Sequence, residues 1–275
     1  FSEKFQDRFF DVGIAEQHAL GLIAGMARAG LKPVLPIYSS FLQRGYDQII
    51  HDIALSGIPV TVCIDRAGIV GNDGETHQGI FDLSFLSSIP NIVIMAPKNF
   101  EELDKMLEFG VNLDKPVFIR YPRGGENFSF ESTEDVELGK AEIVQEGTDL
   151  SIIAIGNMVG RAEEVASLLP EKSVEIINAR FLKPLDEETI LNSIRKTGYC
   201  ITIEDNLLKG GLGSAVVEAV NKSDIQDVKI KNFGYDDTFV EHGTVKELED
   251  KYGLSAEKIS GKLFTFTEMW DIIYR

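Results

Sequence analysis

A glycine-rich segment in the first half of the chain carries three ionisable side chains that can act on one ligand. Arg66, Asp73 and His77 lie within residues 65–90 (DRAGIVGNDGETHQGIFDLSFLSSIP). Long loops in compact domains are usually functional or disordered, and glycines let the backbone approach a ligand closely. Each of the three residues alone would be interpreted as a solvated surface residue, but together they predict a binding site.

A second group of candidate residues lies near the starts of two expected helices. Glu16, in DVGIAEQHAL, either stabilises the helix dipole or hydrogen-bonds a heterocycle nitrogen, because ligands of open α/β sheets bind at the carboxyl ends of strands. Phe41 is either a core residue or a platform on which a heterocycle stacks. Tyr38 and Arg44 flank it, and Arg44 lies one helical turn from Phe41, so both can face one pocket.

A further arginine, Arg123, follows Tyr121-Pro122 at the end of the last expected strand of the first half. Arginine holds phosphate through paired, permanently charged donors. Most of the negative charge of the chain lies after residue 124, so we expect an anionic substrate to bind the first half.

Alternating strand and helix patterns position these residues. Such alternation predicts two doubly wound α/β domains, the first with a mostly parallel sheet. We expect strands at 9–14, 33–38, 59–64, 91–95, 116–121, 150–155, 174–177, 200–203 and 228–233, and helices at 15–29, 41–55, 100–109, 159–169, 187–196 and 214–221, with two more helical segments closing the chain. The expected domains are residues 1–124 and 149–262, joined by a linker at 125–148 and followed by a tail at 263–275.

The composition excludes several classes of protein. The 275 residues include 27 Lys and Arg against 44 Asp and Glu, a net charge of −17, which excludes a nucleic-acid partner. No apolar run reaches the roughly 20 residues of a membrane helix. Cys63 and Cys200 lie in apolar runs and predict buried, reduced thiols in a cytoplasmic protein. The chain begins at Phe1 and is interpreted as a fragment, a processed chain or a subunit.

Four stretches resemble one family of enzymes. DVGIAEQHA, YSSFLQRGYDQIIHDIAL, DRAGIVGNDGETHQGIFDLSFL and IRYPRG are similar to the 1-deoxy-D-xylulose-5-phosphate synthases, which are thiamine-diphosphate-dependent and transketolase-like. The resemblance runs from Phe1 to about Gly261. It implies the family's pyrimidine-binding domain without that domain's first helix and strand, then its C-terminal domain with a mixed sheet. The tail at 263–275 does not resemble the family.

The resemblance also implies cofactors. Thiamine diphosphate is expected, with Mg²⁺ bound by a diphosphate-binding domain that this chain lacks, and with no metal ligand in the chain itself. Glu16 matches the glutamate that contacts the aminopyrimidine N1′ and promotes its imino tautomer. Phe41 matches the ring stacked on the pyrimidine, and Ile14 is implied as a further cofactor contact.

The substrates implied are pyruvate and glyceraldehyde 3-phosphate. The residues implied around them are Tyr38, Arg44, Arg66, Asp73, His77 and Arg123. Among these, Arg66 and Arg123 are expected to bind the phosphate, and His77 to hydrogen-bond or transfer a proton at the reacting carbonyl. Arg120 is interpreted as structural.

The implied reaction forms 1-deoxy-D-xylulose 5-phosphate and CO₂ for isoprenoid, thiamine and pyridoxal synthesis, in a homodimer completed by the missing domain. Two alternatives stay open. One is the small subunit of a split transketolase or of a 2-oxoacid dehydrogenase first component. The other is a non-catalytic dimerisation or regulatory module.

Overall fold

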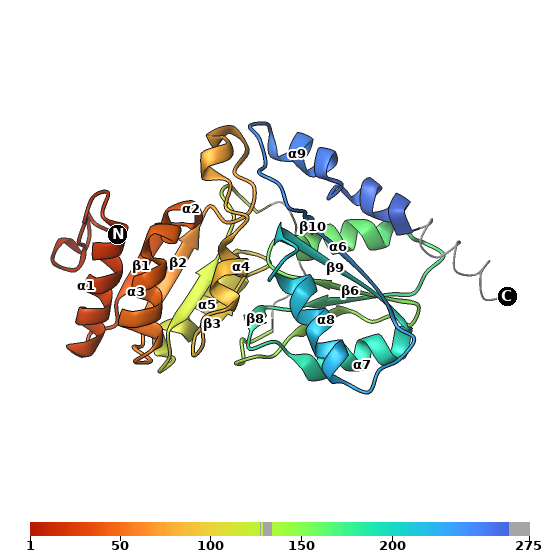
Figure 1. Ribbon diagram of the computed structural model, residues 1–275, viewed down its shortest axis with the longest axis horizontal. Coiled ribbons are helices and arrows are strands. Elements are labelled where there is room, and N and C mark those ends of the chain that lie inside the picture. The colour runs from red at the N-terminus through yellow and green to blue at the C-terminus, as the bar shows by residue number, and fades with distance from the viewer. Residues whose placement is uncertain (127, 129–133, 264–275) are drawn as a thin grey trace.

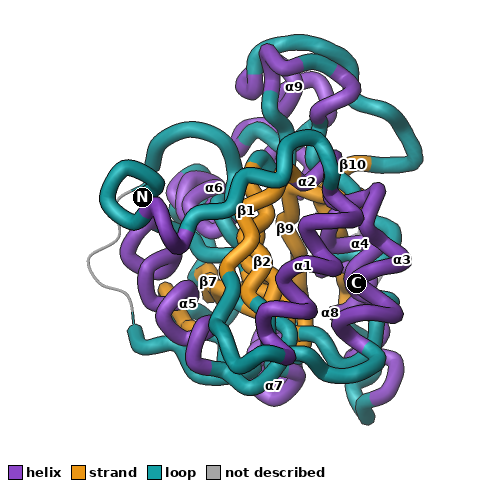
Figure 2. Tube along the Cα trace, turned by 90° about the vertical axis from the view of Figure 1, so that its left-hand side faces the viewer, coloured by secondary structure: helices purple, strands orange, loops and turns teal. Residues whose placement is uncertain are grey.

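The computed structural model describes residues 1–126, 128 and 134–263, and Figure 1 shows two α/β halves side by side. Helices lie on both sides of the strands when the molecule is seen from its end (Figure 2). The expected tail at 263–275 lies, except for its first residue, outside the described residues. Within the described part of the chain no helix is long and apolar enough to cross a membrane.

The first half is built on a sheet ordered β1-β2-β4-β3-β8, in which β1, β2, β4 and β3 are parallel. Its inner strands β2, β4 and β3 are mostly apolar and almost wholly buried, as central parallel strands require, whereas the edge strand β1 is partly exposed. The elements are η1 (Gln6–Arg8), α1 (Glu16–Arg28), β1 (Val34–Tyr38), α2 (Ser39–Leu42), η2 (Gln43–Gly45), α3 (Tyr46–Gln48), η3 (Ile49–Ala54), β2 (Thr61–Asp65), η4 (Gly71–Asp73), η5 (Glu75–His77), α4 (Asp82–Ser87), β3 (Val93–Met95), α5 (Phe100–Asn112) and β4 (Val117–Arg120).

The second half has a sheet ordered β10-β9-β6-β7-β5. Because β5 runs antiparallel to β7 while the other pairs are parallel, this sheet is mixed, as the resemblance implies. The elements are β5 (Glu142–Gln145), β6 (Leu150–Ala154), α6 (Met158–Ser167), β7 (Val174–Asn178), β8 (Phe181–Lys183), α7 (Glu187–Thr197), β9 (Tyr199–Leu207), α8 (Leu212–Lys222), β10 (Lys229–Tyr235) and α9 (Val245–Tyr252), and residues 256–263 are helical.

Three expectations about these elements are wrong. Residues 9–14 form no strand: Gly13 has φ +64° and its N–H binds the Asp11 side chain at 2.8 Å, so the backbone turns, and Ile14 is 90% exposed. The expected linker contains β5, and the long segment at 65–90 contains α4. Both were missed because elements this short have little periodicity of their own.

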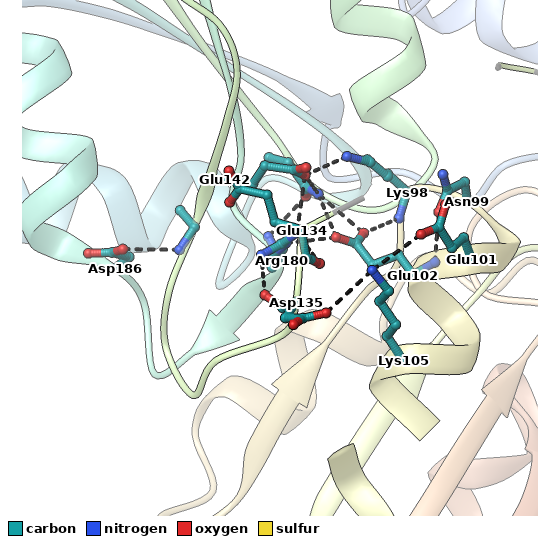
Figure 3. Close-up of polar contacts among 12 residues, drawn as sticks. Lys98, Asn99, Glu101, Glu102, Lys105, Glu134, Asp135, Glu142, Arg180 and Asp186 are labelled. Atoms are coloured by element: carbon teal, nitrogen blue, oxygen red, sulfur yellow. Dashed lines mark hydrogen bonds and ion pairs between the residues drawn. The ribbon is translucent and has the colours of Figure 1, made fainter. Parts of the chain in front are cut away.

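One strand joins the two halves. β8 follows β7 in the second half, yet it pairs antiparallel with β3 at the edge of the first sheet. Directly before β8, Arg180 donates from Nε to Glu102 at 2.7 Å, and Lys98 pairs with Glu142, so two buried cations neutralise two buried carboxylates (Figure 3). Asn178 donates to both carboxylates, at 3.0 and 3.1 Å. Satisfied buried networks of this kind hold a fixed geometry, so the halves are joined through a defined polar contact.

Both cysteines are buried and free, as the sequence predicts. Burial disfavours the thiolate and raises the pKa of Cys63 to about 11.

Candidate functional site

The connection between β2 and α4, called here loop 66–81, is closed at its base. Gly68 and Gly79 exchange two backbone hydrogen bonds of 2.7 Å. A Cβ at Gly79 would lie 2.2 Å from the carbonyl oxygen of Arg66, and Gly68 has φ +76°, so both positions favour glycine. The residues between Gly68 and Gly79, which include Asp73 and His77, therefore form a closed loop.

Two arginines converge on one carboxylate in this loop. Arg66 follows β2 and Arg123 lies just beyond β4, and because these strands are parallel neighbours their carboxyl ends meet at one edge of the sheet. Arg66 binds Oδ2 of Asp73 and Arg123 binds Oδ1. The side chains of Arg66 and Asp73 are 23% and 20% exposed, whereas Arg123 is 48% exposed. The cluster carries a formal charge of +1, which can attract an anion.

Aromatic rings extend this cluster toward His77. The Arg66 guanidinium lies 4.0 Å from the centroid of the Tyr38 ring, which stacks on Phe41 with centroids 5.2 Å apart. Phe41 contacts the His77 ring edge-on at 5.4 Å, and His77 Nδ1 lies 2.9 Å from Thr76 Oγ1. Arg123, Asp73, Arg66, Tyr38, Phe41 and His77 therefore form one continuous chain of contacts.

Glu16 lies in the first turn of α1 with one carboxylate oxygen, Oε2, buried. This oxygen has no hydrogen-bond partner among the described residues. A buried polar atom without a partner costs about 1–3 kcal/mol, so a ligand that brings a polar hydrogen to it is favoured. The first turn of α1 lies close to η2, since a Cβ at Gly45 would be 3.9 Å from the Glu16 carbonyl oxygen.

Two other sequence candidates are exposed. Ile14 is 90% exposed, and Arg44 in η2 is exposed as well. Within the described residues no hydrogen bond, ion pair or ring contact joins Ile14, Glu16 or Arg44 to the arginine–aromatic chain of contacts. Arg120 is buried and donates to Asp82 at 2.8 Å and to the Asp205 carbonyl at 3.0 Å, a structural arrangement.

A cleft of about 1190 Å³ opens between the two halves beside the arginines. Arg66, Tyr121 and Arg123 line it from the first half, and Arg161, Asp205 and Glu249 line it from the second. Sequence reasoning missed this second group, because nothing in a strand such as CITIEDNL indicates which neighbouring domain its end will face. In the described part of the chain no three acidic, histidine or cysteine side chains gather as a metal site.

Family models match the chain in two consecutive parts. The model of the transketolase pyrimidine-binding domain matches residues 1–126, and that of the transketolase C-terminal domain matches residues 139–259.

The chain is similar over most of its length to curated bacterial proteins. The 1-deoxy-D-xylulose-5-phosphate synthases of Halothermothrix orenii and Desulforudis audaxviator are 52% and 48% identical to it, each over 94% of this chain. The chain spans 41% and 42% of the length of these two proteins, which is less than half.

Two solved structures share the fold. A protein described as a split gene transketolase, inactive beta4 tetramer, superposes with a TM-score of 0.88 and 30% identity, covering 95% of this chain and 84% of the other. Transketolase from Campylobacter jejuni gives a TM-score of 0.75 at 21% identity, covering 93% of this chain and 39% of that one. Matching domains in the same order, together with a 30% identical relative covered over 84% of its length, establish the relationship. The chain belongs to the transketolase family and carries its pyrimidine-binding and C-terminal domains.

Proposed function

We propose that this chain forms the pyrimidine-binding and C-terminal domains of a 1-deoxy-D-xylulose-5-phosphate synthase. The enzyme would join pyruvate to glyceraldehyde 3-phosphate and release CO₂. The observation that carries the proposal is the convergence of Arg66 and Arg123 on Asp73 beside His77, in a chain about half identical to proteins of that name. The other parts of the proposal are a cytoplasmic homodimer, completed by a domain that binds the diphosphate and Mg²⁺.

The residues of the first half suit a pyrimidine ring. Thiamine diphosphate, when bound, supplies an electron sink for the carbanion left by decarboxylation of pyruvate. Glu16 fits this group because its buried Oε2 lacks a partner, and it would hold a proton at the ring nitrogen N1′. Phe41 provides a ring for stacking, and Ile14, which is exposed, is available as a further apolar contact.

The arginine pair suits the phosphate of the second substrate. Asp73 fixes both guanidinium groups and offsets one of their two charges, so the remaining positive charge faces a dianion. Charge-assisted hydrogen bonds to phosphate are the strong ones. Tyr38 holds the Arg66 guanidinium against its ring, and Arg44 is available at the exposed side.

His77 would hydrogen-bond the reacting carbonyl or transfer to it the proton that the reaction consumes. When the new carbon–carbon bond forms, the aldehyde oxygen of glyceraldehyde 3-phosphate becomes a hydroxyl and takes up one proton. Histidine is the side chain that most often acts as a general acid or base in enzymes. The side chain contacts the Phe41 ring and lies within hydrogen-bond distance of the Thr76 hydroxyl.

The proposal is tested by measuring which donor substrate the holoenzyme uses. Holoenzyme here means this chain assembled with a diphosphate-binding domain. We expect equal amounts of CO₂ and 1-deoxy-D-xylulose 5-phosphate from pyruvate and glyceraldehyde 3-phosphate. Transfer of a two-carbon unit from a ketose phosphate without CO₂ would indicate a split transketolase instead. Decarboxylation of pyruvate with the aldehyde left unconsumed would indicate a dehydrogenase component. No turnover of any donor would indicate a non-catalytic module.

A further inference from the structure

The C-terminal half holds loop 66–81 by its two ends. Ile69 and Ile80 are buried in the hydrophobic core of the second half rather than in that of their own sheet. The N–H of Ile69 donates to the Asp205 side chain at 3.2 Å, and the N–H of Leu207 donates to the Ile80 carbonyl at 2.9 Å. The loop that carries Asp73 and His77 is therefore anchored in a domain that carries none of the residues proposed to bind substrate or cofactor.

Asp205 fills the space that a side chain at Gly68 would need. A Cβ at Gly68 would lie 1.6 Å from the nearer carboxylate oxygen of Asp205, which is 4% exposed. The base of the loop and the end of β9 are thus in direct contact.

Gln78 makes a second connection from within the loop. This side chain is 3% exposed, accepts from the N–H of Val70 at 2.8 Å and donates to the backbone carbonyl of Glu241 at 3.0 Å. Glu241 precedes α9, and Figure 1 shows the tip of the loop, in orange at the top, beside the start of α9. A Cβ at Gly71 would lie 3.1 Å from the Gly243 carbonyl oxygen, so the two segments are close-packed there.

We propose that Gln78 is a positioning residue through which the C-terminal domain fixes the placement of Asp73 and His77. The proposal rests on the proposed function, because it assigns the loop a role in the same reaction. Gln78 directly follows His77, and its bond to Val70 closes the loop around Asp73. Removing the amide leaves the buried Val70 N–H and the partly buried Glu241 carbonyl without the partner that Gln78 gives them. Such groups regain hydrogen bonds only by moving toward water, which displaces the loop.

Gln78→Met tests the connection, because methionine has a similar length and makes neither hydrogen bond. Gln145→Met is the matched control: Gln145 also donates to a backbone carbonyl, that of Val174 at 2.7 Å, but it lies in β5, away from the loop. In the holoenzyme we expect amide exchange at Val70 and across 241–245 to rise about tenfold or more in Gln78→Met, since exchange follows local opening. Gln145→Met should leave both segments unchanged. Unchanged exchange in Gln78→Met would overturn the connection.

Kinetics test the positioning role. We expect Gln78→Met to lower kcat for condensation about tenfold, with the KM for pyruvate within about twofold of the parent. Gln78→Glu keeps the acceptor for Val70 but places a carboxylate oxygen against the Glu241 carbonyl, so it disrupts only the contact between domains. It should lower kcat while the Val70 amide stays protected.

If both variants open the Glu241 segment but keep the parent kcat, Gln78 is structural and the positioning role is wrong. A parent holoenzyme that fails to condense the two substrates would instead refute the proposed function, and the exchange result would still decide whether Gln78 connects the domains.

Discussion

Arg123→Ala in the holoenzyme should weaken the binding of glyceraldehyde 3-phosphate and leave the binding of pyruvate and the fold nearly unchanged. Arg123 is 48% exposed and shares Asp73 with Arg66, so its loss leaves the carboxylate paired. The fold should therefore be preserved, with a change in the free energy of unfolding below about 1 kcal/mol, as for exposed ion pairs.

The size of the kinetic effect follows from the exposure of the side chain. A hydrogen bond to a charged group contributes about 1.5–3 kcal/mol, and solvent at a half-exposed arginine favours the lower end. We expect the KM for glyceraldehyde 3-phosphate to rise by about tenfold, with pyruvate unaffected. Arg66→Ala should raise the KM for glyceraldehyde 3-phosphate by a larger factor, because Arg66 is only 23% exposed and lies against the Tyr38 ring.

Unphosphorylated glyceraldehyde provides the control substrate, because it lacks the group that Arg123 is proposed to bind. Steady-state assays with both aldehydes should show that Arg123→Ala loses activity only with the phosphate. Equal losses with the two aldehydes would refute the assignment and make Arg123 a structural residue.

Three other predictions concern the cofactor and the stability of the fold. Glu16→Gln should slow C2–H exchange of bound thiamine diphosphate by about 10²–10⁴-fold, the usual size of an acid–base contribution, measured by NMR on quenched samples; exchange at the parent rate would exclude the role of Glu16. This chain alone should bind thiamine diphosphate and Mg²⁺ only weakly by calorimetry, because the proposed diphosphate ligands belong to another domain, and submicromolar binding would contradict this. Burial raises the pKa of Glu249 to about 7 against the opposing effect of Arg161, so the folded state binds this proton more tightly than the unfolded state. The resulting stability is present below pH 4.5 and is lost as pH rises through about 7, by about 3 kcal/mol. Urea unfolding at pH 5 and pH 8 should show this loss reduced in Glu249→Gln; an equal loss in parent and variant would contradict it.

Local sequence patterns predicted most of the helices and parallel strands. The run at 59–64 is rich in β-branched residues and was expected to be a strand, and β2 covers Thr61–Asp65. The expected helix at 187–196 is observed as Glu187–Thr197, capped by Asp186, which accepts from the Thr189 N–H. Patterns of this kind lie within one element, so the sequence alone reveals them.

A further element that the sequence analysis does not predict, β8, depends on a partner far away in the chain. β8 is three residues long and is a strand only because β3, about ninety residues earlier, lies beside it. Conversely, the apolar residues at 9–14 lack such a partner strand among the described residues, and Phe9, Phe10 and Ile14 stay exposed. Pairing over long sequence separations leaves no periodic signal in so short a segment.

Some residues of the candidate site were identified from the sequence, and others only from the packing of the two halves. The resemblance implies that Arg66 and Arg123 bind the same phosphate, and the structure places both of them on the Asp73 carboxylate. Gln78 and Asp205 were not identified, because their contacts cross between the two halves. Only the packing of the two domains reveals them.

The location of the acceptor phosphate is the most direct measurement. A crystal structure of the holoenzyme with thiamine diphosphate and glyceraldehyde 3-phosphate, without pyruvate, should show the phosphate bound by Arg66 and Arg123, with the aldehyde directed toward His77. A phosphate bound elsewhere, with the two arginines still paired only to Asp73, would contradict the assignment of this site.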